Sequence, residues 1–339
     1  MRKLALGFFV VLVICVGLYL RVHHRRGPVE TAYAGSQQLT LWSSTAAVRE
    51  VAATASFGDR LEVLSRSGDQ AQVRTISGTI GWVDAGDLLS EEFWQKAKTL
   101  LNETGTRPIE VRGQTRVISN LHLDPARDSP RIRQLSKGVP LKMFERRPVA
   151  VPQSDPTAPG SPPGGGEAAS MAASTRQEDW WLVRAQPASQ GDVAGWMLGR
   201  FIGLDVPAPL PDYATSAGVR IVAWFVLNHM ADKKSGAMPQ YLVLGTHGSE
   251  GQPCDFTLLR AYTWDKPRQR YETAFVESDL CGKLPVQLTS GSTPNGDASF
   301  AFDDWNSGAA QHRSYRMTGT SIRRVREGSA TRQELKHKR

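Results

Sequence analysis

The chain has 339 residues, of which 40% are hydrophobic and 22% charged, and its formal net charge is +8. This composition supports folded cores and excludes a chain that is disordered throughout. Three cysteines are too few for a four-cysteine zinc site or a disulfide-dense miniprotein. The positive charge lies at the ends, since residues 1–26 and residues 320–339 each carry +5 and the 293 residues between them sum to −2. A nucleic-acid-binding face is therefore disfavoured, and we expect no nucleic-acid partner.

Residues 4–20 form an apolar run of 17 residues without a charge. This length reaches the minimum for a membrane-spanning helix and predicts a single uncleaved anchor in the lipid bilayer, with residues 1–35 as anchor and juxtamembrane linker. The A-x-A sequence Ala32-Tyr33-Ala34 lies too far beyond the apolar run, behind a basic segment, for signal cleavage. Ile14 before Cys15 does not fit a lipoprotein signal. Basic residues flank both ends of the run, so charge alone leaves its orientation open.

Two segments of the chain share one pattern. Residues 57–66 (FGDRLEVLSR) and 137–146 (KGVPLKMFER) each place a glycine before alternating apolar residues and an arginine. This alternation predicts a half-buried strand entered from a glycine turn. Each segment is preceded by an L-x-L strand and followed by a Val-Arg strand and a Gly-Trp pair: Leu39 and Leu41, Val73-Arg74 and Gly81-Trp82 in the first copy; Leu121 and Leu123, Val183-Arg184 and Gly195-Trp196 in the second. The sequence thus predicts two copies of a small β-module, at residues 36–90 and 112–205.

This order of motifs resembles the bacterial SH3-like (SH3b) domains of cell-envelope proteins, whose pattern closes with G-W-V-x-x-x-x-L. The matching segments are GTIGWVDAGDLL at 78–89 and VAGWMLGRFIGL at 193–204. The resemblance implies two small β-barrels that bind a peptide, the cell wall or a protein partner, with peptidoglycan as the family's usual ligand. The first copy has Asp69-Gln70-Ala71 where the family carries a tryptophan, so we expect an incomplete ligand groove there.

Three tryptophans are candidate ligand contacts: Trp82, Trp180 and Trp196. For the two Gly-Trp pairs, core packing is the favoured role and ligand contact the alternative, because the glycine lets the backbone turn closely and the tryptophan then buries a large face. Trp180 and its neighbour Trp181 must point to opposite faces of a strand. We therefore expect one of them, Trp180, to be exposed or to lie in a groove, unless the adjacent insert covers it.

Residues 148–179 contain six prolines and four glycines and predict a disordered insert at a hairpin tip of the second module. Residues 91–111 predict a linker helix. Ser90 can cap it, acidic residues occupy its first turn, and apolar residues recur at helical spacing. We expect this helix to dock the two modules at a fixed angle.

Residues 206–325 predict a β-rich C-terminal domain of seven short strands, arranged as an antiparallel sheet or barrel. Cys254 and Cys281 flank its clearest hairpin, so they are either disulfide-bonded or two buried thiols. Residues 326–339 form a basic tail without apolar periodicity, which predicts disorder, with either a solubilising role or electrostatic contact to anionic polymers or lipids. The fold class expected for the whole chain is mainly β, with one N-terminal transmembrane helix.

The sequence contains no recognisable catalytic constellation. Cys254 lies in Q-P-C-D-F, unlike the D-C-S nucleophile of wall-cleaving cysteine peptidases, and His247 with Glu250 has HxxE spacing but no third ligand in a motif. We therefore expect a non-enzymatic binding or scaffold protein without cofactor or metal, anchored in the inner membrane with its bulk in the periplasm. Two alternatives stay open: a hydrolase with a metal- or cysteine-dependent C-terminal domain targeted by the SH3-like modules, and a scaffold facing the cytoplasm.

Overall fold

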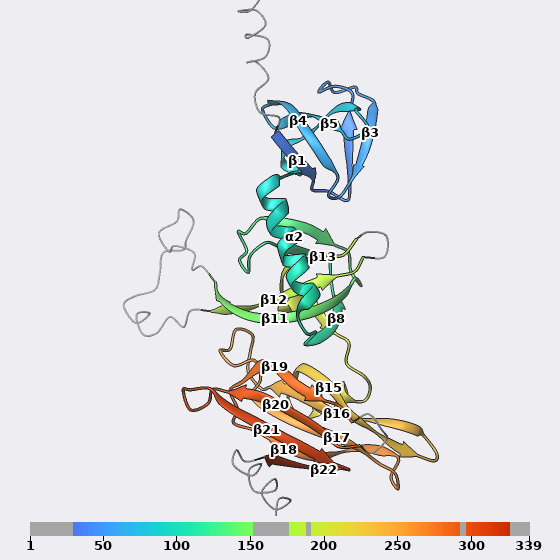
Figure 1. The fold of residues 1–339 in the computed structure, drawn as a ribbon, viewed down its shortest axis with the longest axis vertical. Coiled ribbons are helices and arrows are strands. Elements are labelled where there is room, and N and C mark those ends of the chain that lie inside the picture. The colour runs from blue at the N-terminus through green and yellow to red at the C-terminus, as the bar shows by residue number, and fades with distance from the viewer. Residues whose placement is uncertain (1–29, 152–175, 188–190, 292–295, 326–339) are drawn as a thin grey trace, which may run out of the picture. The chain divides into compact units, whose positions relative to one another are not determined.

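The structure is a computed structural model that describes residues 30–151, 176–187, 191–291 and 296–325 (Figure 1). The chain divides into two compact units, Met1–Lys98 and Thr99–Arg339, and each is described by itself. The predicted mainly β fold is confirmed. The expected anchor at residues 4–20 and the basic tail lie outside the described residues. In the described ranges, every helix is too short or too polar to cross a bilayer.

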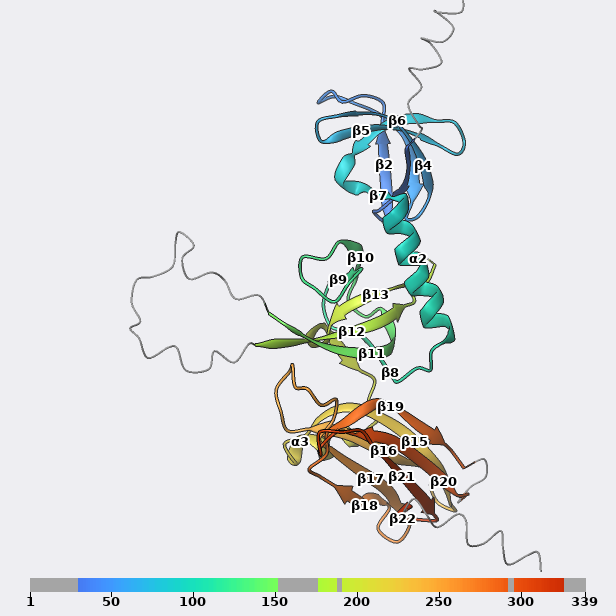
Figure 2. The ribbon, with the colours of Figure 1, turned by 60° about the vertical axis from the view of Figure 1, so that its left-hand side comes forward.

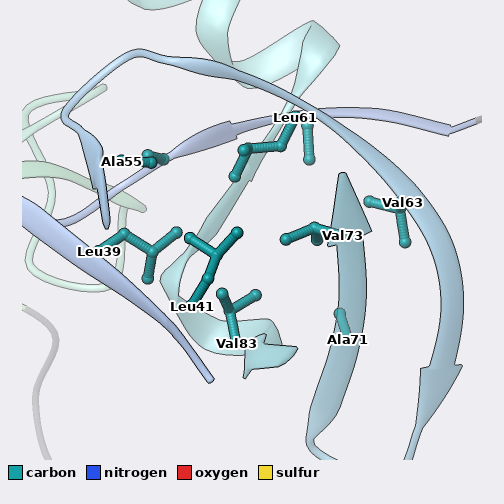
Figure 3. Packing of buried hydrophobic residues seen from close by; sticks show 10 residues of the cluster. Leu39, Leu41, Ala55, Leu61, Val63, Ala71, Val73 and Val83 are labelled. Atoms are coloured by element: carbon teal, nitrogen blue, oxygen red, sulfur yellow. The ribbon is translucent and has the colours of Figure 1, made fainter. Parts of the chain in front are cut away.

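The first module is a seven-stranded antiparallel sheet with the strand order β3-β2-β6-β5-β4-β1-β7. Its strands are β1 Glu30–Ala34, β2 Gln38–Trp42, β3 Val51–Ser56, β4 Arg60–Ser67, β5 Gln70–Thr75, β6 Ile80–Asp84 and β7 Leu88–Ser90. The module begins at β1, earlier than the predicted boundary at residue 36, because β1 pairs with both β4 and β7. Its core collects alternate residues of neighbouring strands, among them Leu41, Leu61, Val73 and Val83, on the inner side of the curled sheet (Figure 3).

The second module repeats this topology with the strand order β10-β9-β13-β12-β11-β8-β14. Its strands are β8 Val111–Thr115, β9 Ser119–His122, β10 Arg131–Leu135, β11 Pro140–Ala150, β12 Gln177–Ala185, β13 Val193–Leu198 and β14 Ile202–Leu204. Each strand takes the place of the strand seven numbers earlier. The internal duplication read from the sequence is therefore present in the fold as well.

The predicted insert is shorter than residues 148–179. The strands β11 and β12 pair from Leu141↔Ala185 out to Ala150↔Gln177, so both ends of that range are strand. Figures 1 and 2 show these two strands extending as an arm from the second module. The extension is stabilised because Val149 packs against an apolar cluster that includes Trp180. The predicted disorder itself falls on residues 152–175, outside the described residues.

The helix α2 (Glu91–Thr106) lies within the predicted linker segment and ends before Pro108, which cannot continue it. Ser90 Oγ accepts the Phe93 N–H at 3.2 Å, as a cap does. In the first unit, the ring of Trp94 stacks on Tyr33 with centroids 5.0 Å apart. In the second unit, Leu100 packs against the second module. The fixed docking angle stays a prediction.

The C-terminal domain has the short helix α3 (Leu210–Ser216) and two four-stranded antiparallel sheets. The first contains β15 Arg220–Asp232, β16 Gly236–Thr246, β17 Leu258–Asp265 and β18 Arg270–Glu277, and the second contains β19 Gly282–Thr289, β20 Ala298–Asp304, β21 Gln311–Thr318 and β22 Ser321–Val325. The sheets contact each other, as Phe275 and Tyr315 show with centroids 6.0 Å apart. The described residues of this domain thus hold eight strands where the sequence predicted seven, because the segment 314–325, predicted as one strand, turns at Gly319, whose φ is +60°.

Candidate functional site

The glycine of each Gly-Trp pair lies where two strands approach closely. A Cβ on Gly81 would lie 2.7 Å from Leu41 Cβ, and one on Gly195 would lie 2.9 Å from the His122 carbonyl oxygen. Both contacts are shorter than real Cβ atoms tolerate, so neither strand pair could close over a larger residue. The glycines therefore let β6 and β13 cross their neighbours β2 and β9.

The tryptophan after the glycine lies on the outer face of the sheet in both modules. In the first module, Val83 is 1% exposed and belongs to the core, while Trp82 is only half-buried. Trp82 is the register partner of Gln72, which lies between the core residues Ala71 and Val73 in the chain. The expected core role of Trp82 is thus taken by Val83, because strand alternation allows only one of these neighbours to face inwards.

Four apolar side chains share this outer face, which we call the Trp42–Trp82 face: Trp42, Val51, Ile80 and Trp82. Trp42 is the register partner of both Trp82 and Val51, and Ile80 lies two residues before Trp82. Side chains so related point to the same side of a sheet. Val51 is 58% exposed and Ile80 44%. The guanidinium of Arg49 lies 4.5 Å from the ring centroid of Trp42, in a cation–π arrangement.

The Trp42–Trp82 face is bordered by charged groups. Arg74 is the register partner of Ile80, and its Nη1 lies 3.0 Å from Glu62 Oε2. Asp84 lies two residues after Trp82 and is exposed. No ion pair to Asp84 occurs among the described residues. The carboxylate of Asp84 therefore adds a negative charge to the border of the face, and Arg74 does not neutralise it because Arg74 pairs with Glu62. The face can accordingly hold an apolar group with a cation beside it.

The second module has the same face, but there it is closed. Trp196 lies at the position of Trp82 and is 4% exposed. Trp180, Leu182 and Leu198 surround it, at the positions that the repeat gives to Gln70, Gln72 and Asp84 of the first module. Further cover comes from Leu100, Val149 and Phe201, and from Arg147, whose guanidinium lies 4.5 Å from the centroid of the Trp196 ring. This face is therefore part of the folded core of the second unit.

The expectation that Trp180 is exposed or in a groove is wrong. Trp180 is 1% exposed and Trp181 6%, although they do point to opposite faces. The ring of Trp180 lies edge-on to His122 in the closed face, with centroids 5.3 Å apart. Trp181 lines a cavity together with Ile221 and Val222 of the C-terminal domain. Alternation predicted the directions correctly, but a second layer covers each face.

The second module is joined to the C-terminal domain by a buried arginine. Arg146 Nη2 lies 2.6 Å from Asp179 Oδ1, and Nη1 lies 2.8 Å from Asp255 Oδ1. The guanidinium also donates to the carbonyl oxygens of Gln252 and Cys254. The Arg146 side chain is 3% exposed. A buried guanidinium is stable only when its carboxylate partners are present. The burial of Arg146 therefore requires both the second module, which supplies Asp179, and the C-terminal domain, which supplies Asp255.

Glu110 lies at the same junction. It is 5% exposed and lines a cavity with Phe144, Asp255 and Pro285. Burial raises the pKa of this carboxyl to about 7; a hydrogen bond from the backbone of Val286 opposes the rise, and the charge of Asp255 adds to it. The carboxyl therefore titrates within the physiological range.

Cys254 and Cys281 are disulfide-bonded in the structure, which is one of the two forms that the sequence left open. Cys254 is thus not a free thiol. His247, the other residue considered for catalysis, has its Nδ1 3.0 Å from the Gly218 carbonyl oxygen. Within the described ranges, no group of three or more His, Cys, Asp or Glu side chains is placed to hold a metal ion.

Sequence reasoning missed Trp42 and Arg49 as parts of the outer face. The available signal was the position of Trp42 directly after Leu41 in an alternating strand, which sets its side chain opposite to the core. It also missed that Arg66 and Arg146, which the repeat aligns, have different surroundings. Arg66 pairs with Glu30 at the surface, with its side chain 44% exposed, whereas Arg146 is buried.

Comparisons with known proteins leave the family open. No family model matches the chain, and no curated protein matches it. Among solved structures, the crystal structure of an NlpC/P60 family protein from Bacillus cereus ATCC 10987 is similar over 56% of this chain, at 14% identity and a TM-score of 0.21. The matched part spans 62% of that protein. A likeness at this level carries no argument about fold or activity.

Proposed function

We propose that the chain is a membrane-anchored, non-enzymatic protein of the bacterial cell envelope, and that its two modules are SH3-like domains. In this proposal residues 4–20 anchor it in the inner membrane, and the remainder lies in the periplasm and binds a peptide, the cell wall or a protein partner. The first module provides the ligand surface. The second is a structural domain packed on the C-terminal domain.

One observation carries the proposal: the outer tryptophan is half-buried and uncovered in the first module, whereas its counterpart Trp196 is 4% exposed. Clustered aromatic and aliphatic side chains at a surface are typical of binding sites, because their burial against a partner is favourable. The Trp42–Trp82 face combines two half-buried tryptophans with two exposed aliphatic residues. We propose this face as the ligand surface although the sequence predicts an incomplete groove in the first copy.

The disulfide supports the proposed compartment. Disulfides persist in oxidising surroundings such as the periplasm and are rare in the cytosol. The Cys254–Cys281 pair links the loop before β17 to the start of β19. This link supports export of the C-terminal domain and opposes the scaffold that faces the cytoplasm.

Cosedimentation with purified sacculi tests the proposed function. The full chain in mild detergent is expected to sediment with sacculi, and the Trp82→Ala variant is expected to remain in the supernatant. Trp305→Ala is the matched control, since Trp305 is a 46% exposed tryptophan of the C-terminal domain. Retention that is equal in the Trp82→Ala variant, or absent in all three proteins, would contradict binding of the wall by the first module.

A further inference from the structure

The two modules differ at one hairpin. In the first module, β4 ends at Ser67 and the chain turns at Gly68, whose φ is +62°, before β5 begins at Gln70. In the second module, β11 continues from Arg147, the counterpart of Ser67, to Ala150. The register confirms this equivalence, since Ser67 pairs with Gln70 as Arg147 pairs with Trp180.

In the second module, Arg147 and the strand residues that follow it cover the tryptophan face. The Arg147 guanidinium lies 4.5 Å from the centroid of Trp196, and Val149 packs against the cluster that contains Trp180 and Trp196. Arg147 and Val149 are alternate residues of one strand, so both project to the same side. A short extended segment, Arg-x-aliphatic, is therefore part of the cover that closes this face in the second module.

The first module lacks this segment and keeps the face. Its strand ends at Ser67, which stands in the place of Arg147, and the described residues place no cation over Trp82. In addition, Asp84 occupies the position of Leu198, so a negative charge replaces an apolar side chain beside the tryptophan. This difference favours a basic group in the partner. A guanidinium over Trp82 would form a cation–π interaction with the ring and a charge-assisted hydrogen bond with the nearby carboxylate.

We propose that the Trp42–Trp82 face binds an extended peptide segment of a partner protein in which an arginine is followed two residues later by an aliphatic side chain. The arginine stacks on Trp82 beside Asp84, and the aliphatic side chain packs on the exposed apolar surface of Ile80 or Val51. The partner's arginine thus takes the place over Trp82 that Arg147 of the chain itself takes over Trp196. This inference rests on the proposed function of the first module as the ligand-binding domain.

Calorimetric titration of the full chain with the peptide acetyl-RPVAVP-amide tests the inference, because this peptide is the chain's own sequence from residue 147 to residue 152. Wild-type protein is expected to bind it, and Trp82→Ala to weaken binding about tenfold or more. The same loss is expected when alanine replaces the peptide's arginine. Asp84→Asn is expected to weaken binding about threefold at low salt and less at high salt. Trp305→Ala should leave the affinity unchanged.

Two outcomes overturn the inference: no binding of the peptide to wild-type protein, or equal binding of the arginine and alanine peptides. Failure here is distinct from failure of the proposed function. If the peptide does not bind but cosedimentation with sacculi still depends on Trp82, the inference falls and the binding role of the face stands. If Trp82→Ala changes neither measurement, both fall.

Discussion

Arg146 and Asp255 form a buried ion pair between the second module and the C-terminal domain, with Nη1 2.8 Å from Oδ1 and side chains 3% and 7% exposed. The same guanidinium binds Asp179, so truncation would leave two buried carboxylates without the cation that they share. We expect Arg146→Ala to lower the stability of the second unit by about 3–5 kcal/mol. Urea unfolding followed by circular dichroism measures this loss.

The repeat supplies the control for this prediction. Arg66 is the counterpart of Arg146, and its pair with Glu30 has side chains 44% and 50% exposed. Exposed pairs contribute little because water and salt screen them, so Arg66→Ala should cost less than about 1 kcal/mol. Equal losses in the two variants would show that Arg146 is not buried between the two parts.

Glu110 makes the stability of the second unit depend on pH. Its pKa is about 7 in the folded chain against an ordinary value of 4.5, so the folded state binds the proton more tightly than the unfolded state. The stabilisation of the folded state by protonated Glu110 is therefore fully present below pH 4.5 and is lost as pH rises to about 7. Glu110→Gln is expected to match wild type at pH 4 and to exceed its stability above pH 7. A constant difference across thermal melts from pH 4 to pH 8 would contradict this assignment.

The disulfide predicts the thiol content of the protein. Because Cys254 and Cys281 are linked, the denatured, unreduced chain should expose a single reactive thiol, Cys15, of its three cysteines. Replacing both linked cysteines by serine should destabilise the C-terminal domain by about 3 kcal/mol, mainly through the entropy of the unfolded chain. Detection of three thiols in protein prepared without reductant would rule out the bond.

Replacement of Trp196 and of Trp82 by alanine should lower the stability of the protein by different amounts. Trp196→Ala removes a 4% exposed side chain and is expected to cost about 3–5 kcal/mol. Trp82→Ala removes a half-buried one, and we expect it to cost less than about half as much. Differential scanning calorimetry of the two variants compares them. A larger loss for Trp82→Ala would place this residue among the core and remove the basis for a binding face.

The duplication was predictable because glycine turns, alternating apolar residues and Gly-Trp pairs are local patterns. The direction of each side chain in a strand was predictable as well. What covers an outward-facing side chain was not, since this depends on packing between segments far apart in the chain. Trp180 shows this: its strand sets its direction, but Val149 and Leu100 bury it.

The same limit explains the buried network at the second module. Nothing in the sequence near Arg146 separates it from Arg66, because its partners Asp179 and Asp255 are 33 and 109 residues away. The length of β11 was missed for a related reason. A proline-rich stretch predicts disorder by composition, whereas the last residues of β11 are held by pairing with β12.

The most direct test of the central claim, that the Trp42–Trp82 face is the ligand surface, is site-specific photo-crosslinking in cells. A photoreactive residue is placed at Ile80 on that face or at Val276, a 49% exposed control position on the C-terminal domain. We expect an adduct from position 80 that disappears in the Trp82→Ala background, and none from position 276. The same adduct yield at both positions, or an adduct at position 80 that does not depend on Trp82, would contradict the account.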